Sequence, residues 1–121
     1  AICRAWNCKA AKLPTHQRLD FALIRNGEIC AFAEIKCRTF EMGRYKDTML
    51  HFDKIMAART LSQNTRLPAF LVVRWTDCIA SVDFKLDFKP TMGGRRDRGL
   101  ERDFGLMGII PTSAFNIIER L

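Results

Sequence analysis

The chain has 121 residues, of which 48% are hydrophobic and 27% are charged, so it is long enough for one hydrophobic core and too hydrophobic for a disordered protein. We therefore expect one domain over residues 1–121. Twenty Lys and Arg against 13 Asp and Glu give a net charge of +7, which favours polyanionic partners, although a basic but uninvolved surface is an equal alternative.

The sequence fits neither a membrane-spanning protein nor a protein held together by disulfides. The longest aliphatic run, residues 69–73, is far below the roughly 20 residues that a membrane span needs. The five cysteines form no C-x-x-C pair, which indicates reduced, mostly buried thiols rather than a zinc site. No signal peptide is visible, so we expect a cytoplasmic protein.

Residues 1–12 are rich in alanine and stop before Pro14, which predicts a helix. Residues 19–38 read as two β-strands joined at Asn26-Gly27, with Asp20 in the first strand and Glu34-Ile35-Lys36 near the end of the second. Two carboxylates and a lysine at the rim of apolar strands suit a divalent-metal phosphodiesterase.

The register of this hairpin decides whether such a site can form. A two-residue loop at Asn26-Gly27 without a bulge places Asp20 opposite Ala33, on the face away from Glu34 and Lys36. A three-residue loop, or an equivalent bulge, brings Asp20 to the face of Glu34. The metal-site hypothesis therefore predicts the odd loop or a bulge.

Residues 45–63 read as a buried helix with two apolar stripes, and Lys54 lies in one of them. That lysine is either a core-edge residue with an exposed ammonium group or a cation for a substrate phosphate. Residues 69–75 predict a central strand and residues 78–84 a half-exposed one.

Residues 85–105 are the least regular part and read as a loop, in which Arg95 and Arg98 belong to an arginine cluster after Gly93-Gly94. Such a loop is solvated in most proteins, but contact with phosphates is plausible in a basic domain. Residues 106–110 predict a short strand and residues 112–121 a final helix. The sum is a mixed α/β sheet covered by at least one helix.

Hydrolysis of a phosphodiester needs charge neutralisation at phosphorus and an activated water. Asp20, Glu34 and the main-chain carbonyl of Ile35 could supply oxygen ligands for Mg²⁺ or Mn²⁺, which takes one or two carboxylates. Lys36 projects from the same face as Glu34 and could orient the attacking water or offset developing charge.

The pattern D-x13-E-I-K resembles that of the PD-(D/E)xK nuclease superfamily. Four segments are similar in sequence to small phage-encoded members, so the resemblance spans nearly the whole chain: residues 33–38, 50–58, 68–75 and 93–99. It implies a restriction-endonuclease-like core, with a mixed sheet of about four strands flanked by helices. It also implies metal ligation by Asp20 and Glu34, catalysis by Lys36, and substrate contacts by Lys54, Arg95 and Arg98.

Two departures from the family pattern stand out. Leu19 occupies the place of the proline that names the motif, and no acidic residue precedes Asp20, where many relatives carry a glutamate on the first helix. That glutamate would lie upstream of Ala1 if the chain is part of a longer one. Otherwise we expect weaker metal binding, reduced activity or a single ion.

The resemblance implies a Mg²⁺- or Mn²⁺-dependent deoxyribonuclease, more specifically an endonuclease that could act on branched DNA as resolvase-like relatives do. A homodimer would suit cutting of two strands, and a phage-encoded enzyme would work in the host cytoplasm. The alternatives are a non-catalytic nucleic-acid-binding module with the same fold and a basic structural protein.

Overall fold

The computed structural model describes residues 2–14, 19–86, 88–94 and 104–121. The described residues form two sheets, a 14-residue helix, a four-residue helix and two 3-10 turns. In chain order these are α1 (Ile2–Ala5), β1 (Lys9–Lys12), β2 (Phe21–Arg25), β3 (Glu28–Cys37), η1 (Met42–Arg44), β4 (Asp47–His51), α2 (Phe52–Thr65), β5 (Ala69–Arg74), β6 (Cys78–Asp83), β7 (Lys89–Gly94), β8 (Phe104–Pro111), η3 (Thr112–Ala114) and β9 (Asn116–Arg120).

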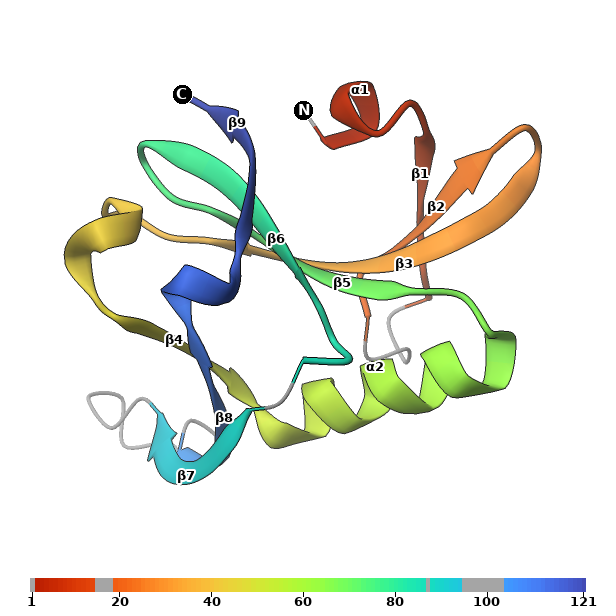
Figure 1. Ribbon diagram of the computed structural model, residues 1–121. Helices are drawn as coiled ribbons and strands as arrows, with labels where there is room; N and C mark the ends of the chain where they lie inside the picture. The colour runs from red at the N-terminus through yellow and green to blue at the C-terminus, as the bar shows by residue number, and fades with distance from the viewer. Residues whose placement is uncertain (1, 15–18, 87, 95–103) are drawn as a thin grey trace.

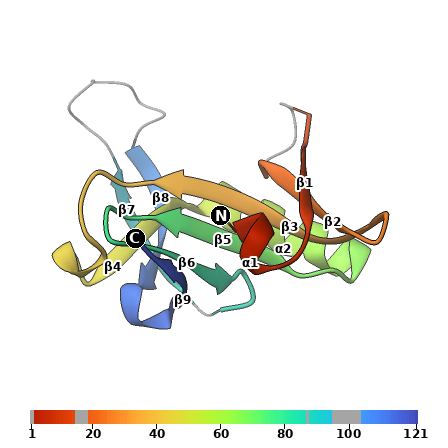
Figure 2. The ribbon, with the colours of Figure 1, turned by 90° about the horizontal axis from the view of Figure 1, so that it is seen from above.

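The larger sheet has six strands in the order β1-β2-β3-β5-β6-β9, visible side by side in Figure 2. Strands β3 and β5 run parallel and the other neighbours antiparallel, so the sheet is mixed as predicted. The main hydrophobic core lies between this sheet and α2, which covers one face, while α1 and both chain ends lie on the other (Figure 1).

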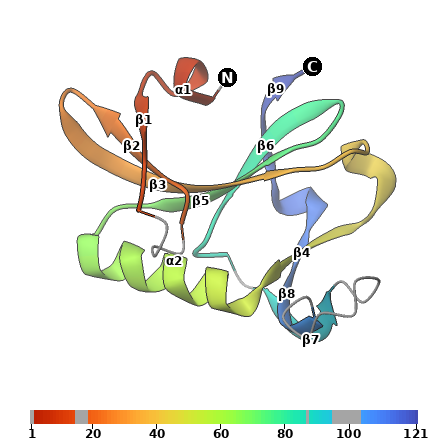
Figure 3. The same cartoon turned by 180° about the vertical axis from the view of Figure 1, so that it is seen from behind.

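The smaller sheet has three strands in the order β4-β8-β7. It adjoins the first turn of α2, because β4 ends at His51 and the helix begins at Phe52. From there α2 runs beneath the larger sheet (Figure 3) and ends at Thr65, because the next residue, Arg66, has a left-handed φ of 59° that stops the helix. No helix in the described part of the chain has the length and apolar character needed to cross a membrane.

The mixed α/β architecture is confirmed, but the sheet has more than the four expected strands. The predicted strands at residues 69–75, 78–84 and 106–110 are confirmed as β5, β6 and β8. Strand β6 is buried almost throughout rather than half exposed, since α2 and the N-terminal segment cover opposite faces of the sheet.

Both predicted terminal helices are wrong over most of their length. The first ends at Ala5, because Asn7 takes a left-handed φ of 52° and the lysine-flanked strand β1 then pairs with β2. At the other end only η3 is helical, and β9 pairs with β6. Short strands are stabilised by pairing with the edge of a sheet, and the amino-acid composition of a segment does not reveal that such an edge is available.

Two internal predictions also need correction. The helix expected over residues 45–63 begins only at Phe52, since Thr48 and Leu50 alternate with exposed residues in strand β4. In the segment read as a loop, residues 89–94 form strand β7, paired with β8. Of the five thiols, Cys78 is buried, three are half-buried and Cys37 is exposed, so the expectation of mostly buried thiols is wrong.

Candidate active site

A two-residue turn and a bulge beside it set the pairing of β2 with β3, and thereby the positions of Asp20 and Glu34. Asn26 and Gly27 have φ values of 53° and 77°, as a two-residue turn of the hairpin type requires, so the three-residue loop is not formed. Instead the register shifts between Leu23 and Ile24, which leaves Cys30 as an extra residue in β3. The predicted bulge is confirmed.

The bulge sets the pairing of the site residues. Beyond it Phe21 pairs with Ala33, so that Asp20 follows directly opposite Glu34. Without the extra residue Asp20 would lie opposite Ala33 and project to the other face of the sheet.

Asp20 is tied to the backbone of β3. Its Oδ2 accepts a hydrogen bond from the Ile35 N–H at 3.0 Å. The N–H groups of Phe32 and Arg38 point to β5, where they donate to the carbonyls of Pro68 and Arg74. Both residues are an even number of positions from Glu34, and Ile35 is an odd number from them. Ile35 therefore presents both its N–H and its carbonyl to the opposite edge, beyond the end of β2.

Glu34 is a charged residue inside the core. It is 1% exposed, and its Oε1 lies 2.9 Å from Lys54 Nζ of α2 and 3.6 Å from Lys36 Nζ. Burial raises the pKa of the Glu34 carboxyl, and the hydrogen bond and charge of Lys54 oppose that rise. The folded protein thus holds a carboxylate in an environment that disfavours its charge.

The other oxygen of Glu34, Oε2, has no partner in the part of the chain that the structure describes. Oε2 is buried and accepts no hydrogen bond from the described residues. A buried carboxylate oxygen left in this state costs free energy, and a bound cation would remove that cost. The donor set fits Mg²⁺ or Mn²⁺: the carboxylates of Asp20 and Glu34 and the Ile35 carbonyl are hard oxygen ligands, and such ions take the rest of their shell from water and substrate.

The described residues contain no group of three or more His, Cys, Asp or Glu side chains suited to a metal ion. Two carboxylates are compatible with Mg²⁺, which commonly binds through one or two, but not with an all-protein cage of the kind found in structural sites. An ion at this position would therefore keep an open coordination sphere.

The structure brings together five of the seven predicted site residues: Asp20, Glu34, Ile35, Lys36 and Lys54. Arg95 and Arg98 lie outside the described residues. Lys54 Nζ pairs with Glu34 Oε1 at 2.9 Å and the Lys54 side chain is 29% exposed, so this lysine lies at the edge of the core beside the site, and its contact with a substrate phosphate stays a prediction.

Sequence reasoning missed one cation. Lys12 Nζ lies 3.8 Å from Asp20 Oδ1, because Lys12 of β1 pairs with Phe21. No signal in the sequence pointed to it, since the segment reads as a helix by composition. The side chain is 63% exposed, so this ion pair is weak and free to open.

Comparison with known proteins adds a family and a fold. A family model described as "Phage putative PDDEXK endonuclease" matches residues 1–118. No curated protein matches the chain. Among solved structures, the chain is similar to Hjc, a Holliday junction resolvase from the archaeal hyperthermophile Archaeoglobus fulgidus, with a TM-score of 0.61 and 13% identity over 93% of this chain and 79% of that one. The two proteins share a fold.

Proposed function

Because the chain belongs to the family of phage putative PDDEXK endonucleases, we propose that it hydrolyses DNA phosphodiester bonds as a Mg²⁺- or Mn²⁺-dependent endonuclease. The observation that carries the proposal is the buried carboxylate of Glu34, which has Asp20 opposite it in the strand register and whose Oε2 has no partner among the described residues. A core residue maintained at this cost is typical of a functional site.

In this proposal Asp20, Glu34 and the carbonyl of Ile35 hold the ion. When bound, it supplies Lewis acidity at the phosphate and lowers the pKa of a coordinated water. The chain's own contribution is preorganisation: the bulge fixes Asp20 opposite Glu34, and the Ile35 N–H fixes the orientation of the Asp20 carboxylate.

Lys36 is proposed as the catalytic lysine. Its ammonium group lies 3.6 Å from Glu34 Oε1 and the side chain is 34% exposed, so it can contact both the buried carboxylate and a bound substrate. From there it can orient the attacking water or offset the negative charge that develops on the phosphate oxygens. Lys54 opposes the rise in the pKa of Glu34 that burial causes, and it is proposed, with Arg95 and Arg98, to contact substrate phosphates.

We further propose that the enzyme prefers structured DNA, by analogy with the archaeal Holliday junction resolvase of similar fold, and that it works as a homodimer in the host cytoplasm. A dimer would present two sites to two strands.

A cleavage panel tests the proposal. Linear, nicked, single-stranded and four-way-junction DNA are incubated with the protein in Mn²⁺, in Mg²⁺ and in EDTA. We expect cleavage only with metal, and faster cleavage of the junction than of the linear duplex. Full activity in EDTA would refute the metal-dependent mechanism, and equal rates on all substrates would refute the preference for structured DNA.

One observation favours the second candidate, a non-catalytic binding module. Lys54 and Lys36 both approach Glu34 Oε1, so the carboxylate is neutralised to a large extent without a metal. Calorimetry with Mn²⁺ separates the two, because a binding module that has lost catalysis would show no metal site between Asp20 and Glu34.

A further inference from the structure

A pocket of about 530 Å³ opens beside the candidate active site. It lies between the end of β3, the segment from η1 into β4, and strand β8. Its walls combine aromatic and aliphatic side chains with three charged ones, chiefly Arg38, Tyr45, Lys46, Asp47, Met49 and Ile109. The volume is that of a small-ligand site.

Strand β3 links the candidate active site to the pocket, because Arg38 just after its end lines the pocket wall. Arg38 follows Lys36 by two residues and continues the pairing with β5, since its N–H donates to the Arg74 carbonyl at 2.8 Å. Side chains two residues apart in a strand share a face and are spaced by about 7 Å. Glu34, Lys36 and Arg38 therefore form one row that leads from the proposed metal site into the pocket.

The apolar side of the pocket is exposed and firmly supported. Tyr45 is 55% exposed and Met49 43% exposed, so both side chains are accessible to a ligand. The Tyr45 ring packs edge-on against Phe40 at 5.0 Å between centroids. The backbone beneath is anchored as well, because the Thr112 N–H and hydroxyl donate to the Lys46 carbonyl at 2.8 and 2.9 Å.

The charged side chains complete a set that suits one nucleotide. Arg38 and Lys46 are cations for a phosphate at the rim. Asp47 is an acceptor for an exocyclic amino group of a base. The Tyr45 ring is a platform on which any base can stack, and in the free protein the Arg44 guanidinium lies over this ring, 5.8 Å from its centroid.

We propose that this pocket receives an unstacked base of the DNA substrate, next to the phosphate that is cut. The inference rests on the proposed nuclease function and names its substrate class: DNA with an unpaired or extrahelical base near the cleavage point. A fully paired duplex cannot place a base there without breaking a base pair, which costs a few kcal/mol. An already unpaired base avoids that cost.

Binding in EDTA tests this without cleavage. Fluorescence anisotropy compares a paired duplex with the same duplex carrying one extrahelical 2-aminopurine, whose fluorescence is quenched when it stacks. We expect the wild-type protein to bind the extrahelical DNA more tightly and to quench the probe. Tyr45→Ala should weaken binding of the extrahelical DNA about ten-fold, as the loss of one stacked base predicts, and leave paired DNA nearly unchanged.

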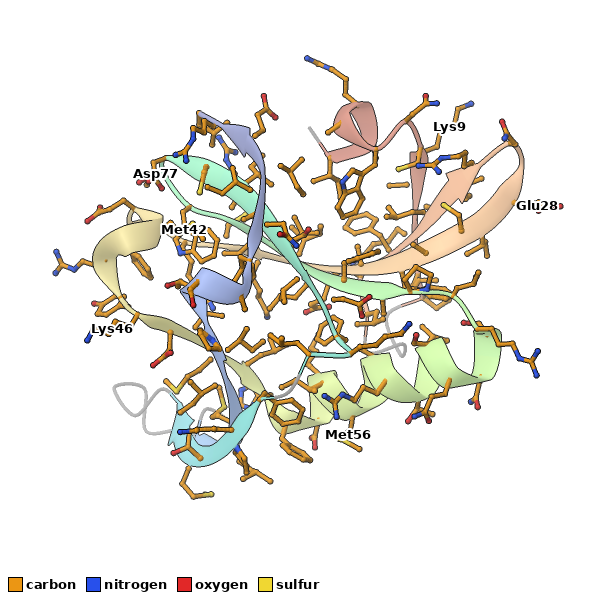
Figure 4. The ribbon with its side chains drawn as sticks, in the orientation of Figure 1. Lys9, Glu28, Met42, Lys46, Met56 and Asp77 are labelled. Atoms are coloured by element: carbon orange, nitrogen blue, oxygen red, sulfur yellow. The ribbon has the colours of Figure 1, made fainter. Side chains whose placement is uncertain are left out.

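Two controls match this variant. Tyr45→Phe keeps the ring and should retain the preference. Met56→Ala removes another exposed apolar side chain, 43% exposed, from α2, away from the Lys46 segment (Figure 4), and should change neither affinity.

The proposal is overturned if Tyr45→Ala weakens both DNAs equally or leaves the quenching intact. Absence of metal-dependent cleavage would refute the proposed nuclease function but would not affect this comparison, because no metal is present in it.

Discussion

Two effects act in opposite directions on the charge of Glu34: burial disfavours the carboxylate, and the ammonium groups of Lys54 and Lys36 beside Oε1 favour it. Because burial raises its pKa, the folded protein binds a proton at this position more tightly than the unfolded chain does. The stabilisation linked to that proton is complete below the ordinary value of about 4.5 and is lost as the pH rises through the raised pKa.

The first prediction follows at neutral pH without metal. Glu34→Gln should unfold at a Tm equal to or higher than that of the wild type in EDTA, since the variant buries no charge. The difference between the two proteins should shrink as the pH falls towards 4.5. Thermal unfolding between pH 5 and 8 measures both.

Bound metal should make the wild type more stable than Glu34→Gln. At a Mn²⁺ concentration of 100 times Kd, the wild type should gain about 2.7 kcal/mol in free energy of unfolding, which raises Tm by several degrees. Glu34→Gln should gain much less. An equal rise in Tm for both proteins would show that Glu34 does not hold the ion.

At the scale of elements, the bulge at Cys30 decides the face on which Asp20 lies. The sequence permitted the prediction that a bulge or an odd loop is needed, because Asn26-Gly27 fixes the turn and the period of two fixes the faces. The position of the bulge could not be predicted, since no residue in β3 other than the unpaired Cys30 identifies it, and Cys30 resembles its apolar neighbours.

Deletion of Cys30 tests the role of this bulge. Loss of the extra residue should restore the regular register, move Asp20 to the other face and reduce metal-dependent cleavage at least 100-fold, with the circular dichroism of the fold retained. The matched control, Cys30→Ala, keeps the chain length and should keep activity. An active deletion variant would exclude the bulge as the determinant of the site.

The elements that sequence reasoning missed are short strands. β1, β4 and β9 have four or five residues each, and their lysine, alanine or polar content fits a helix equally well. What decides is the partner strand: β2, β8 and β6 each offer an open edge of backbone hydrogen bonds. Strands β3 and β5 could be predicted without knowledge of their partner strands, because their apolar runs are typical of buried strands.

The contact between the smaller sheet and α2 can be tested at one glycine. A Cβ on Gly108 of β8 would overlap Ile55 Cδ1 and lie 2.9 Å from Phe88 Cδ2. Gly108→Ala should therefore lower the free energy of unfolding by about 1–3 kcal/mol through overpacking. Gly105→Ala, whose Cβ meets nothing within 4 Å, is the control and should be close to neutral in denaturant unfolding. Equal stability of the two variants would contradict the described packing of β8 on α2.

At the scale of the whole molecule, the site depends on segments that are distant in the chain. Asp20 comes from the start of β2, Glu34 and Lys36 from β3, and Lys54 from the first turn of α2. The sequence motif predicted the first three, since they lie within one hairpin. The place of Lys54 could not be derived from spacing, because it depends on how α2 packs under the sheet.

The net charge of +7 acts at the same scale. It favours encounter with DNA irrespective of sequence. The logarithm of the binding constant should fall with the logarithm of the salt concentration, with a slope of about 0.9 per phosphate contact. In the proposed function, charge would account for binding of DNA and the arrangement around Glu34 for its cleavage.

The most direct test of the account is cleavage of four-way-junction DNA in Mn²⁺ by three proteins: the wild type, Lys36→Ala and Lys9→Ala. Lys9 is an exposed lysine on β1 (Figure 4) and serves as the charge-matched control. We predict that Lys36→Ala cuts at least 100-fold more slowly while binding DNA as well as Lys9→Ala does, and that Lys9→Ala cuts like the wild type. Cleavage by Lys36→Ala at the wild-type rate would contradict the proposed mechanism.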